Sequence, residues 1–201
     1  MFYEPKDGHG LPHDPFKAIV APRPIGWIST VDAESRPNLA PYSYFNAIST
    51  MPPMVCFSSE GLKHSAANAR ATGEFVYNLA IRALAREMNA SSAAVPPDVD
   101  EFELTGLATA PARLVRPPRV AASPAALECR VATFMELADL EGRGVERYLV
   151  IGQVVGVHID EAYLRAGRFD TAAAVPLARC GYQDYTAVDE IFEMLRPGST
   201  G

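Results

Sequence analysis

The sequence contains little cysteine and no long apolar segment. Its three cysteines, Cys56, Cys129 and Cys180, are an odd number without close spacing, which excludes a disulfide framework and a Cys-x-x-Cys metal site. Each is expected to be a small buried hydrophobic residue. No stretch of about 18 consecutive apolar residues occurs, so the sequence predicts no membrane-spanning helix.

Basic charge is also scarce. The 18 lysines and arginines are outnumbered by 24 aspartates and glutamates, which gives a net charge of −6. This balance argues against a nucleic-acid partner, because such proteins usually present a basic face. The polar N-terminal stretch lacks the apolar core of a signal peptide, so we expect the protein to be cytoplasmic.

Several enzyme motifs are missing as well. There is no G-x-G-x-x-G after a strand, no P-loop, no His-Glu-x-x-His and no G-x-S-x-G turn. The histidines show no close metal spacing, since His9 and His13 stand in a segment broken by proline and glycine, and no metal ligand is predicted. His158 lies in an apolar stretch, which is more typical of an edge or hydrogen-bonded histidine than of a catalytic one.

The composition that remains fits one globular domain over residues 1–201. Hydrophobic residues make up 48% of the chain and charged residues 21%, an ordinary balance for a folded protein. Residues 1–15 are rich in glycine and proline and are expected to form an arm. Residues 197–201 are expected to form a frayed tail.

Residue patterns predict a protein built mainly from strands. β-branched and aromatic residues favour strands at 24–31, 54–59, 75–80, 127–138 and 147–159. Residues 39–49 continue the extended pattern, although Pro41 argues against an uninterrupted central strand. Within this stretch, Tyr42 and Tyr44 are predicted to face one way and Phe45 the other. The turn at 139–146 makes the last two strands a hairpin.

Short helices are predicted between these strands. Ser65 as N-cap and Gly73 after the last turn bracket one helix, while 81–93 and 161–167 predict two more. Residues 93–124 are rich in proline and are expected to be irregular. Short turns, rather than helical crossovers, join most of the strands. The pattern therefore favours an antiparallel β-barrel with peripheral helices over a doubly wound sheet.

Hydroxyl and amide side chains gather at strand ends within residues 21–70, among aromatic residues. An apolar slot rimmed by donors and acceptors suits a planar heterocycle. Lys63, His64 and Ser65 begin a helix, where free N–H groups and the helix dipole favour an anion. Together these features describe a pocket for a planar ring with a phosphate tail.

Plainer interpretations exist for the same residues. Ser65 by itself is more often only an N-cap, and Ser58 and Ser59 are usually the exit from a strand into a loop. Trp27 is more often a core residue than a stacking partner. The residues alone leave both interpretations open.

Ordered blocks of this sequence resemble the flavin reductase-like family, which has an FMN-binding split barrel. The blocks are APRPIGWISTVDAESRPNLAPYSYFNAIS, PPMVCFSS and LKHSAANARATGEFVYNLA, and ARCGYQDYT near the end is similar to the closing segment of that family. The resemblance implies a mainly β protein with peripheral helices, a split antiparallel β-barrel of the FMN-binding type. It also implies a homodimer with the flavin near the subunit interface.

The resemblance further implies which residues contact the flavin. The ring would lie along residues 26–30 and 43–46, whose backbone N–H groups would face the reduced ring. The phosphate and ribityl chain would contact Ser58, Ser59, Lys63 and Ser65. The implied cofactor-binding residues are Gly26, Trp27, Ile28, Ser29, Thr30, Ser43, Tyr44, Phe45, Asn46, Ser58, Ser59, Lys63 and Ser65. No catalytic acid or base is predicted, because hydride transfer from a nicotinamide to a flavin demands none.

Two positions depart from the family pattern. The family usually has aspartate where this chain has His64, so the phosphate site should be more positive here. The family commonly has glycine where this chain has Ser35, which affects the first hairpin turn.

The leading hypothesis is an NAD(P)H-dependent FMN reductase, with small-molecule donor and acceptor, that supplies reduced flavin to a partner oxygenase. One alternative is a non-enzymatic FMN redox carrier, and another is an enzyme that keeps FMN bound and acts on its own organic substrate. Residues 179–185 either border the flavin pocket, in the same or a neighbouring subunit, or only pack the tail onto the barrel.

Overall fold

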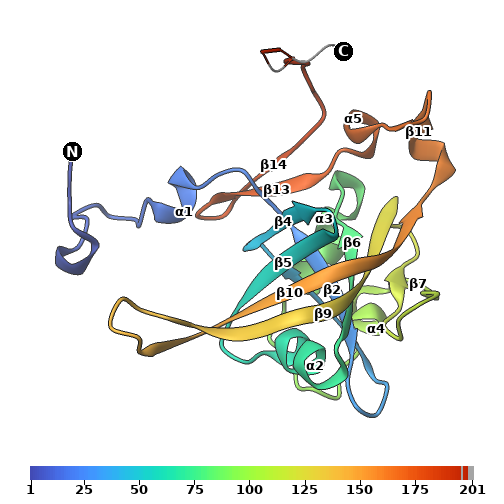
Figure 1. Ribbon diagram of the computed structural model, residues 1–201, viewed down its shortest axis with the longest axis horizontal. Coiled ribbons are helices and arrows are strands. Elements are labelled where there is room, and N and C mark those ends of the chain that lie inside the picture. The colour runs from blue at the N-terminus through green and yellow to red at the C-terminus, as the bar shows by residue number, and fades with distance from the viewer. Residues whose placement is uncertain (196, 199–201) are drawn as a thin grey trace.

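The computed structural model describes residues 1–195, 197 and 198, and its centre is a twisted antiparallel sheet (Figure 1). Along this seven-stranded sheet the order is β3-β2-β6-β9-β10-β5-β4, so β3 and β4 are its edges. Its strands are β2 (Gly26–Val31), β3 (Pro37–Tyr42), β4 (Phe45–Thr50), β5 (Pro53–Glu60), β6 (Glu74–Leu79), β9 (Ala125–Ala138) and β10 (Gly144–Ile159).

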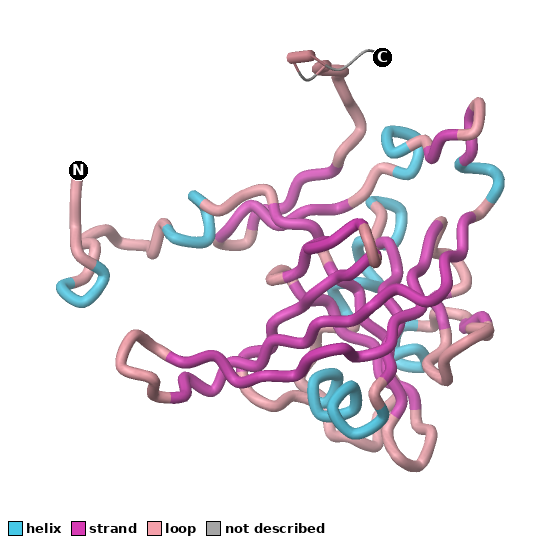
Figure 2. The backbone as a smooth tube through the Cα atoms, viewed as in Figure 1, coloured by secondary structure: helices cyan, strands magenta, loops and turns pink. Residues whose placement is uncertain are grey.

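Smaller elements surround the sheet (Figure 2). The remaining strands are β1 (Arg23–Pro24), β7 (Thr109–Ala110), β8 (Arg119–Val120), β11 (Leu164–Arg165), β12 (Arg168–Phe169), β13 (Leu177–Gly181) and β14 (Asp184–Ala187). The helices are η1 (Pro5–Asp7), α1 (Phe16–Ile19), α2 (His64–Thr72), η2 (Arg82–Leu84), α3 (Ala85–Ala90), α4 (Glu101–Thr105), η3 (Glu161–Tyr163) and α5 (Thr171–Ala174). The prediction of a mainly β protein with peripheral helices is confirmed.

Strand positions in the sheet follow from the side chains. All six residues of β2 are buried, because this strand lies between β3 and β6. Pro41 lies on β3, an edge strand, where a missing N–H costs least. Gly152 on β10 has a packing role, since a Cβ there would lie 2.4 Å from the ring of Phe75.

Two apolar clusters form the core on either side of β2. One contains Ile28, Phe57 and Phe75, and the other contains Trp27 and Phe102. Alternate residues of β2 therefore supply different clusters, as the period of a strand requires. This arrangement fixes β2 as a structural element of the interior.

The β9–β10 hairpin is the longest feature of the sheet. β9 has 14 residues and β10 has 16, and the hairpin tip projects beyond the other strands in Figure 1. β10 pairs with β9 along one side and with β5 along the other. It thus joins strands β5 and β4 to the rest of the sheet.

The predicted strands and the hairpin across residues 139–146 are confirmed, with small shifts of their ends. The facing predicted for residues 39–49 is wrong, because Tyr42 and Phe45 are both buried. Ser43 and Tyr44 form a bend between β3 and β4, and the bend resets the alternation. The irregular range 93–124 holds α4, β7 and β8.

The helix predictions were less accurate. α2 ends before Gly73 as predicted, with φ +72° at that glycine, but its N-cap is Lys63 rather than Ser65. Residues 81–93 divide into η2 and α3. The predicted helix at 161–167 is wrong beyond η3, because the chain continues into a small β11–β12 hairpin.

The arm predicted at residues 1–15 extends away from the sheet in Figure 1 and contains one short helix, η1. Residues 199–201 of the predicted tail lie outside the described residues. All three cysteines are free, and only Cys129 is fully buried, while Cys56 and Cys180 are half-buried.

Candidate functional site

A cleft of about 520 Å³ lies between edge strand β3, strand β5 and the start of α2. Five of the predicted flavin-binding residues line it: Ser43, Tyr44, Ser58, Lys63 and Ser65. Its other lining residues are Lys17, Asn38, Ala40, Pro41, Tyr42, Glu60, Leu62, His64, Ser91, Ser92, Ala93, Ala94, Val95 and Glu101. The volume suits a small-molecule ligand.

The start of α2 provides an anion-binding surface at this cleft. Lys63 has extended backbone angles, and no side chain caps the first turn of the helix. The first intrahelical bond runs from the N–H of Ala67 to the carbonyl of Lys63, so the N–H groups before it are not used inside the helix. Together with the exposed Lys63 ammonium and the helix dipole, they favour a phosphate or carboxylate.

Ser65 lines the cleft and does not cap the helix. Its side chain is buried, and its hydroxyl accepts a hydrogen bond of 3.0 Å from the Nδ2 of Asn38. Burial raises the pKa of Tyr42, although hydrogen bonds with Ser65 and Ser59 act in the opposite direction. Tyr42 therefore stays neutral, and these polar groups fix β3 against the start of α2.

The strand predicted to run along the flavin ring does not line the cleft. Trp27 is fully buried and donates its Nε1–H to Ser91 over 2.9 Å, as expected of a core residue. Ile28 belongs to the apolar core. A Cβ on Gly26 would lie 2.5 Å from the ring of Phe45, so this glycine is explained by packing between two strands.

The polar residues of β2 are also bonded within the protein. The hydroxyl of Ser29 donates to the carbonyl of Pro118 over 2.5 Å, and that of Thr30 accepts from Asn68 over 3.1 Å. Residues 26–29 pair with β3 on one side and β6 on the other. The backbone N–H groups of this segment are consequently part of the sheet, and their contact with a flavin stays a prediction.

Three further predicted residues lie outside the cleft lining. Phe45 stacks on Tyr77 with ring centroids 4.5 Å apart, and Asn46 is exposed on edge strand β4. Ser59 is buried and donates its hydroxyl to the carbonyl of Gly61 over 2.8 Å. Their contact with a flavin stays a prediction.

Residues missed by the sequence prediction also reach the cleft. Residues 91–95 follow α3 and line one wall; the adjacent serines Ser91 and Ser92 were the signal that could have identified them. Glu101 accepts a 3.0 Å bond from the N–H of Leu39, and burial raises the pKa of its carboxyl more than this bond lowers it. Lys17 reaches the cleft from α1, which the sequence pattern did not predict.

A buried arginine lies beside the same cleft. Arg23 is 7% exposed, and its Nη1 donates to the carbonyl oxygens of Lys17 and Val20. Its Nε and Nη2 have no hydrogen-bond partner among the described residues. The guanidinium lies 6.0 Å from the centroid of the Tyr44 ring, and buried donors without partners are rare in folded proteins. Arg23 itself does not line the cleft, and both nitrogens are enclosed by protein.

The C-terminal segment 179–185 does not line the cleft. Arg179 lies over the ring of Tyr185 at 4.4 Å, and Tyr182 packs against His13 of the arm with centroids 5.9 Å apart. Gly181 has φ +94°, and a Cβ there would lie 2.7 Å from the backbone of Ala18, so this position favours glycine. Within the described residues this segment packs the tail against α1 and β1.

The described residues contain neither a metal-binding cluster nor a helix able to span a membrane. No group of three or more His, Cys, Asp or Glu side chains is arranged to hold a metal ion. None of the described helices combines the length and apolar character needed to cross a bilayer.

Comparison with known proteins places this chain in a family. The family model described as "Flavin reductase like domain" matches residues 20–176. An uncharacterized protein of Deinococcus radiodurans is 36% identical over 192 residues, which span 89% of this chain and 82% of that protein.

Solved structures share the architecture. Nitrilotriacetate monooxygenase component B from Bacillus cereus has 27% identity and a TM-score of 0.87, covering 96% of this chain and 98% of its own. The 2-nitrobenzoate 2-nitroreductase of Pseudomonas fluorescens has 23% identity and a TM-score of 0.81, covering 92% and 90%, and supports the fold alone. The fold is the split barrel that the sequence predicted, and the chain belongs to the flavin reductase-like family.

Proposed function

We propose that the cleft at the start of α2 binds FMN and that the protein is an NAD(P)H-dependent flavin reductase. The observation that carries this proposal is the uncapped first turn of α2, with Lys63 beside it and with Ser43, Tyr44 and Ser58 lining the same cleft. One end of the cleft suits a phosphate and the rest suits a flat ring. Family membership supports a flavin-linked oxidoreductase.

Different residues of the cleft would hold the phosphate and the ring of the cofactor. The N–H groups of His64 and Ser65, the Lys63 ammonium and the Ser58 hydroxyl would hold the phosphate. Ser43 and Tyr44, in the bend between β3 and β4, would border the ring. Bound FMN would supply the hydride and electron chemistry, so the protein binds and orients it rather than providing an acid or base.

The reduced flavin is proposed to serve a partner oxygenase. This part of the proposal is supported by the likeness to nitrilotriacetate monooxygenase component B.

A two-fold homodimer is proposed for the assembly. Large apolar side chains are exposed on α1, in the turn after β4 and near the C-terminal end, among them Ile19 at 73%, Met51 at 92% and Phe192 at 85%. A monomeric protein seldom leaves so much apolar surface uncovered, and a two-fold axis buries each patch against its own copy. Light scattering that finds only a monomer at micromolar concentration, with FMN still bound, would contradict this.

The test of function uses the purified full-length chain. Its visible spectrum is recorded first, and aerobic oxidation of NADH and of NADPH is then followed with and without added FMN. Oxidation that rises with added FMN supports the reductase. Flavin retained at near one equivalent without NAD(P)H oxidation indicates the redox carrier or the enzyme with its own substrate, and a protein that neither retains nor binds FMN overturns the whole proposal.

A further inference from the structure

A second cleft lies at the far end of β10 and has no residue in common with the first. Its volume is about 590 Å³, within the range of small-molecule sites. It is lined by Arg113, Leu114, Arg119, Ala121, Ser123, Pro124, Glu128, Gly156, Val157, His158, Ile159 and Asp160. Leu149 of β10 pairs with Ser58 of the first cleft, and His158 lies about 30 Å further along the same strand.

A buried carboxylate organises this second cleft. Glu128 is 1% exposed and accepts the backbone N–H groups of Arg113 and Leu114 at 2.7 and 2.6 Å. It also bonds with Nε2 of His158. Burial alone would raise the pKa of Glu128, but hydrogen bonds from His158 and from the two N–H groups outweigh it, so the pKa lies below its ordinary value. The ionised carboxylate thus holds the loop of residues 113–114 and the imidazole of His158 in place through hydrogen bonds.

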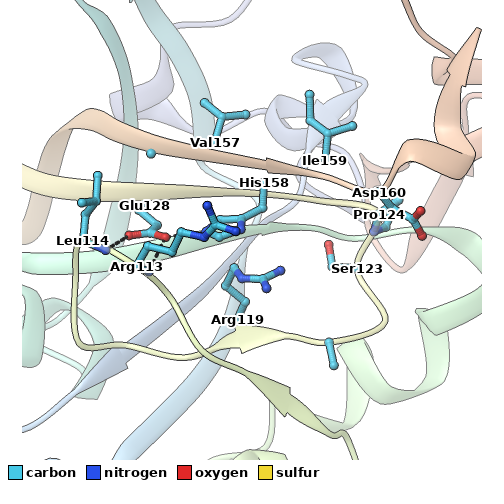
Figure 3. A pocket seen from close by; sticks show the side chains of 12 residues that line it. Arg113, Leu114, Arg119, Ser123, Pro124, Glu128, Val157, His158, Ile159 and Asp160 are labelled. Atoms are coloured by element: carbon cyan, nitrogen blue, oxygen red, sulfur yellow. Dashed lines mark hydrogen bonds and ion pairs between the residues drawn. The ribbon is translucent and has the colours of Figure 1, made fainter.

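Two guanidinium groups stand next to this pair without a carboxylate of their own. Figure 3 shows Arg113 and Arg119 gathered beside His158. The Nε of Arg119 donates to the carbonyl of Pro111 over 3.2 Å, and neither arginine forms an ion pair within the part of the chain that the structure describes. Asp160, the other acid of the lining, accepts the N–H of Ala162 over 2.9 Å. Donors of fixed fork geometry are therefore left for an external acceptor.

The guanidinium groups of Arg113 and Arg119 favour an oxyanion as the ligand. Guanidinium groups bind carboxylates and phosphates through two parallel hydrogen bonds, and a His side chain fixed by a carboxylate adds a third oriented group. Leu114 and Pro124 supply apolar surface for the body of such a ligand. We infer that this cleft binds a small organic molecule with a carboxylate or phosphate group, held by Arg113 and Arg119.

The experiment titrates the full-length protein with phenyl phosphate, benzoate and inorganic phosphate by calorimetry. Phenyl phosphate against benzoate separates a phosphate ligand from a carboxylate, and inorganic phosphate shows whether the apolar body matters. We expect Arg113→Ala and Arg119→Ala each to weaken binding of the best probe at least about tenfold. Arg119→Lys, which keeps the charge but not the fork, should fall between Arg119→Ala and the unaltered protein.

Two controls separate this cleft from a general charge effect and from the flavin cleft. Arg116→Ala removes an exposed arginine of the same loop that pairs with Glu74 at 3.1 Å, and it should leave binding unchanged. Lys63→Ala removes any phosphate bound at the proposed FMN site, and the binding that depends on Arg113 and Arg119 should remain in it. Binding that is lost in Lys63→Ala but kept in Arg119→Ala would overturn the inference, as would a folded protein that binds none of the probes at about 10 mM.

Discussion

The two clefts have similar volumes, about 520 and 590 Å³, but they are built differently. At the first, the cation is an exposed lysine and the other donors are backbone N–H groups of an uncapped helix. At the second, the cations surround a carboxylate that is buried and bonded to the backbone. The cation at the first cleft is therefore one that the fold does not need, whereas the second cleft is organised by a charge on which the fold depends.

The sharpest test of this difference removes the buried carboxylate. Glu128→Ala leaves the N–H groups of Arg113 and Leu114 and the ring of His158 without their acceptor, and we expect the free energy of unfolding to fall by about 3 kcal/mol. Urea unfolding followed by circular dichroism measures it. Glu136→Ala is the matched control, because Glu136 lies on the same strand, is exposed, and accepts one N–H from Glu146; it should cost less than about 0.5 kcal/mol. An equal loss in both variants would contradict the contrast.

The corresponding change at the first cleft should affect binding instead of stability. Lys63→Ala is expected to leave the unfolding curve unchanged, because the lysine is exposed, and to weaken FMN about tenfold by removing a charge-assisted contact. In the unaltered protein FMN should bind more tightly than riboflavin by about 2 to 4 kcal/mol, for the same reason. Fluorescence quenching measures both affinities. Lys6→Ala, on the arm, is the control, and a variant that loses riboflavin as strongly as FMN would show that Lys63 does not contact the phosphate.

Lowering the pH should reduce the contribution of Glu128, in the second cleft, to the free energy of unfolding. The pKa of Glu128 is below its ordinary value of 4.5, so ionisation of this group stabilises the folded protein above that value. The stabilisation is lost as the pH falls through the lower folded-state pKa. We expect the difference in unfolding free energy between the protein and Glu128→Gln to shrink from about pH 5 toward about pH 3. A difference that stays constant over this range would mean that folding does not lower the pKa of Glu128.

The contrast also separates what sequence patterns predict from what they do not. Period-two alternation and turn residues located nearly every strand, because these signals are local. The sequence pattern placed the N-cap of α2 at Ser65, whereas the structure places it at Lys63. The pattern could not show this, because the Ser65 hydroxyl bonds with Asn38, which is distant in sequence.

The site showed the same division. Lys63 and Ser58 were found from a helix start and a strand end. β2 does not line the first cleft, because it pairs with a strand on each side. The second cleft forms because Glu128 bonds with a loop some fifteen residues earlier in the chain. Neither contact leaves a periodic trace in the sequence.

The smallest expected effect concerns the turn that joins β2 to β3, which carries Asn38 and Tyr42 into the first cleft. Ser35 has φ +66° there, a left-handed conformation that costs a residue with a Cβ roughly 1 kcal/mol. Asp32 holds the turn, since it accepts the N–H of Arg36 over 2.9 Å and its Nε over 2.6 Å, and this bonding remains when residue 35 changes. Ser35→Gly should therefore raise the unfolding free energy by about 0.5 kcal/mol, the relief of strain less the greater entropy of glycine in the unfolded chain. Ser35→Ala keeps the strain and should give no gain in the same urea titration. If Ser35→Gly is no more stable than Ser35→Ala, the positive φ is not a source of strain in this turn, and the departure from the family glycine is neutral.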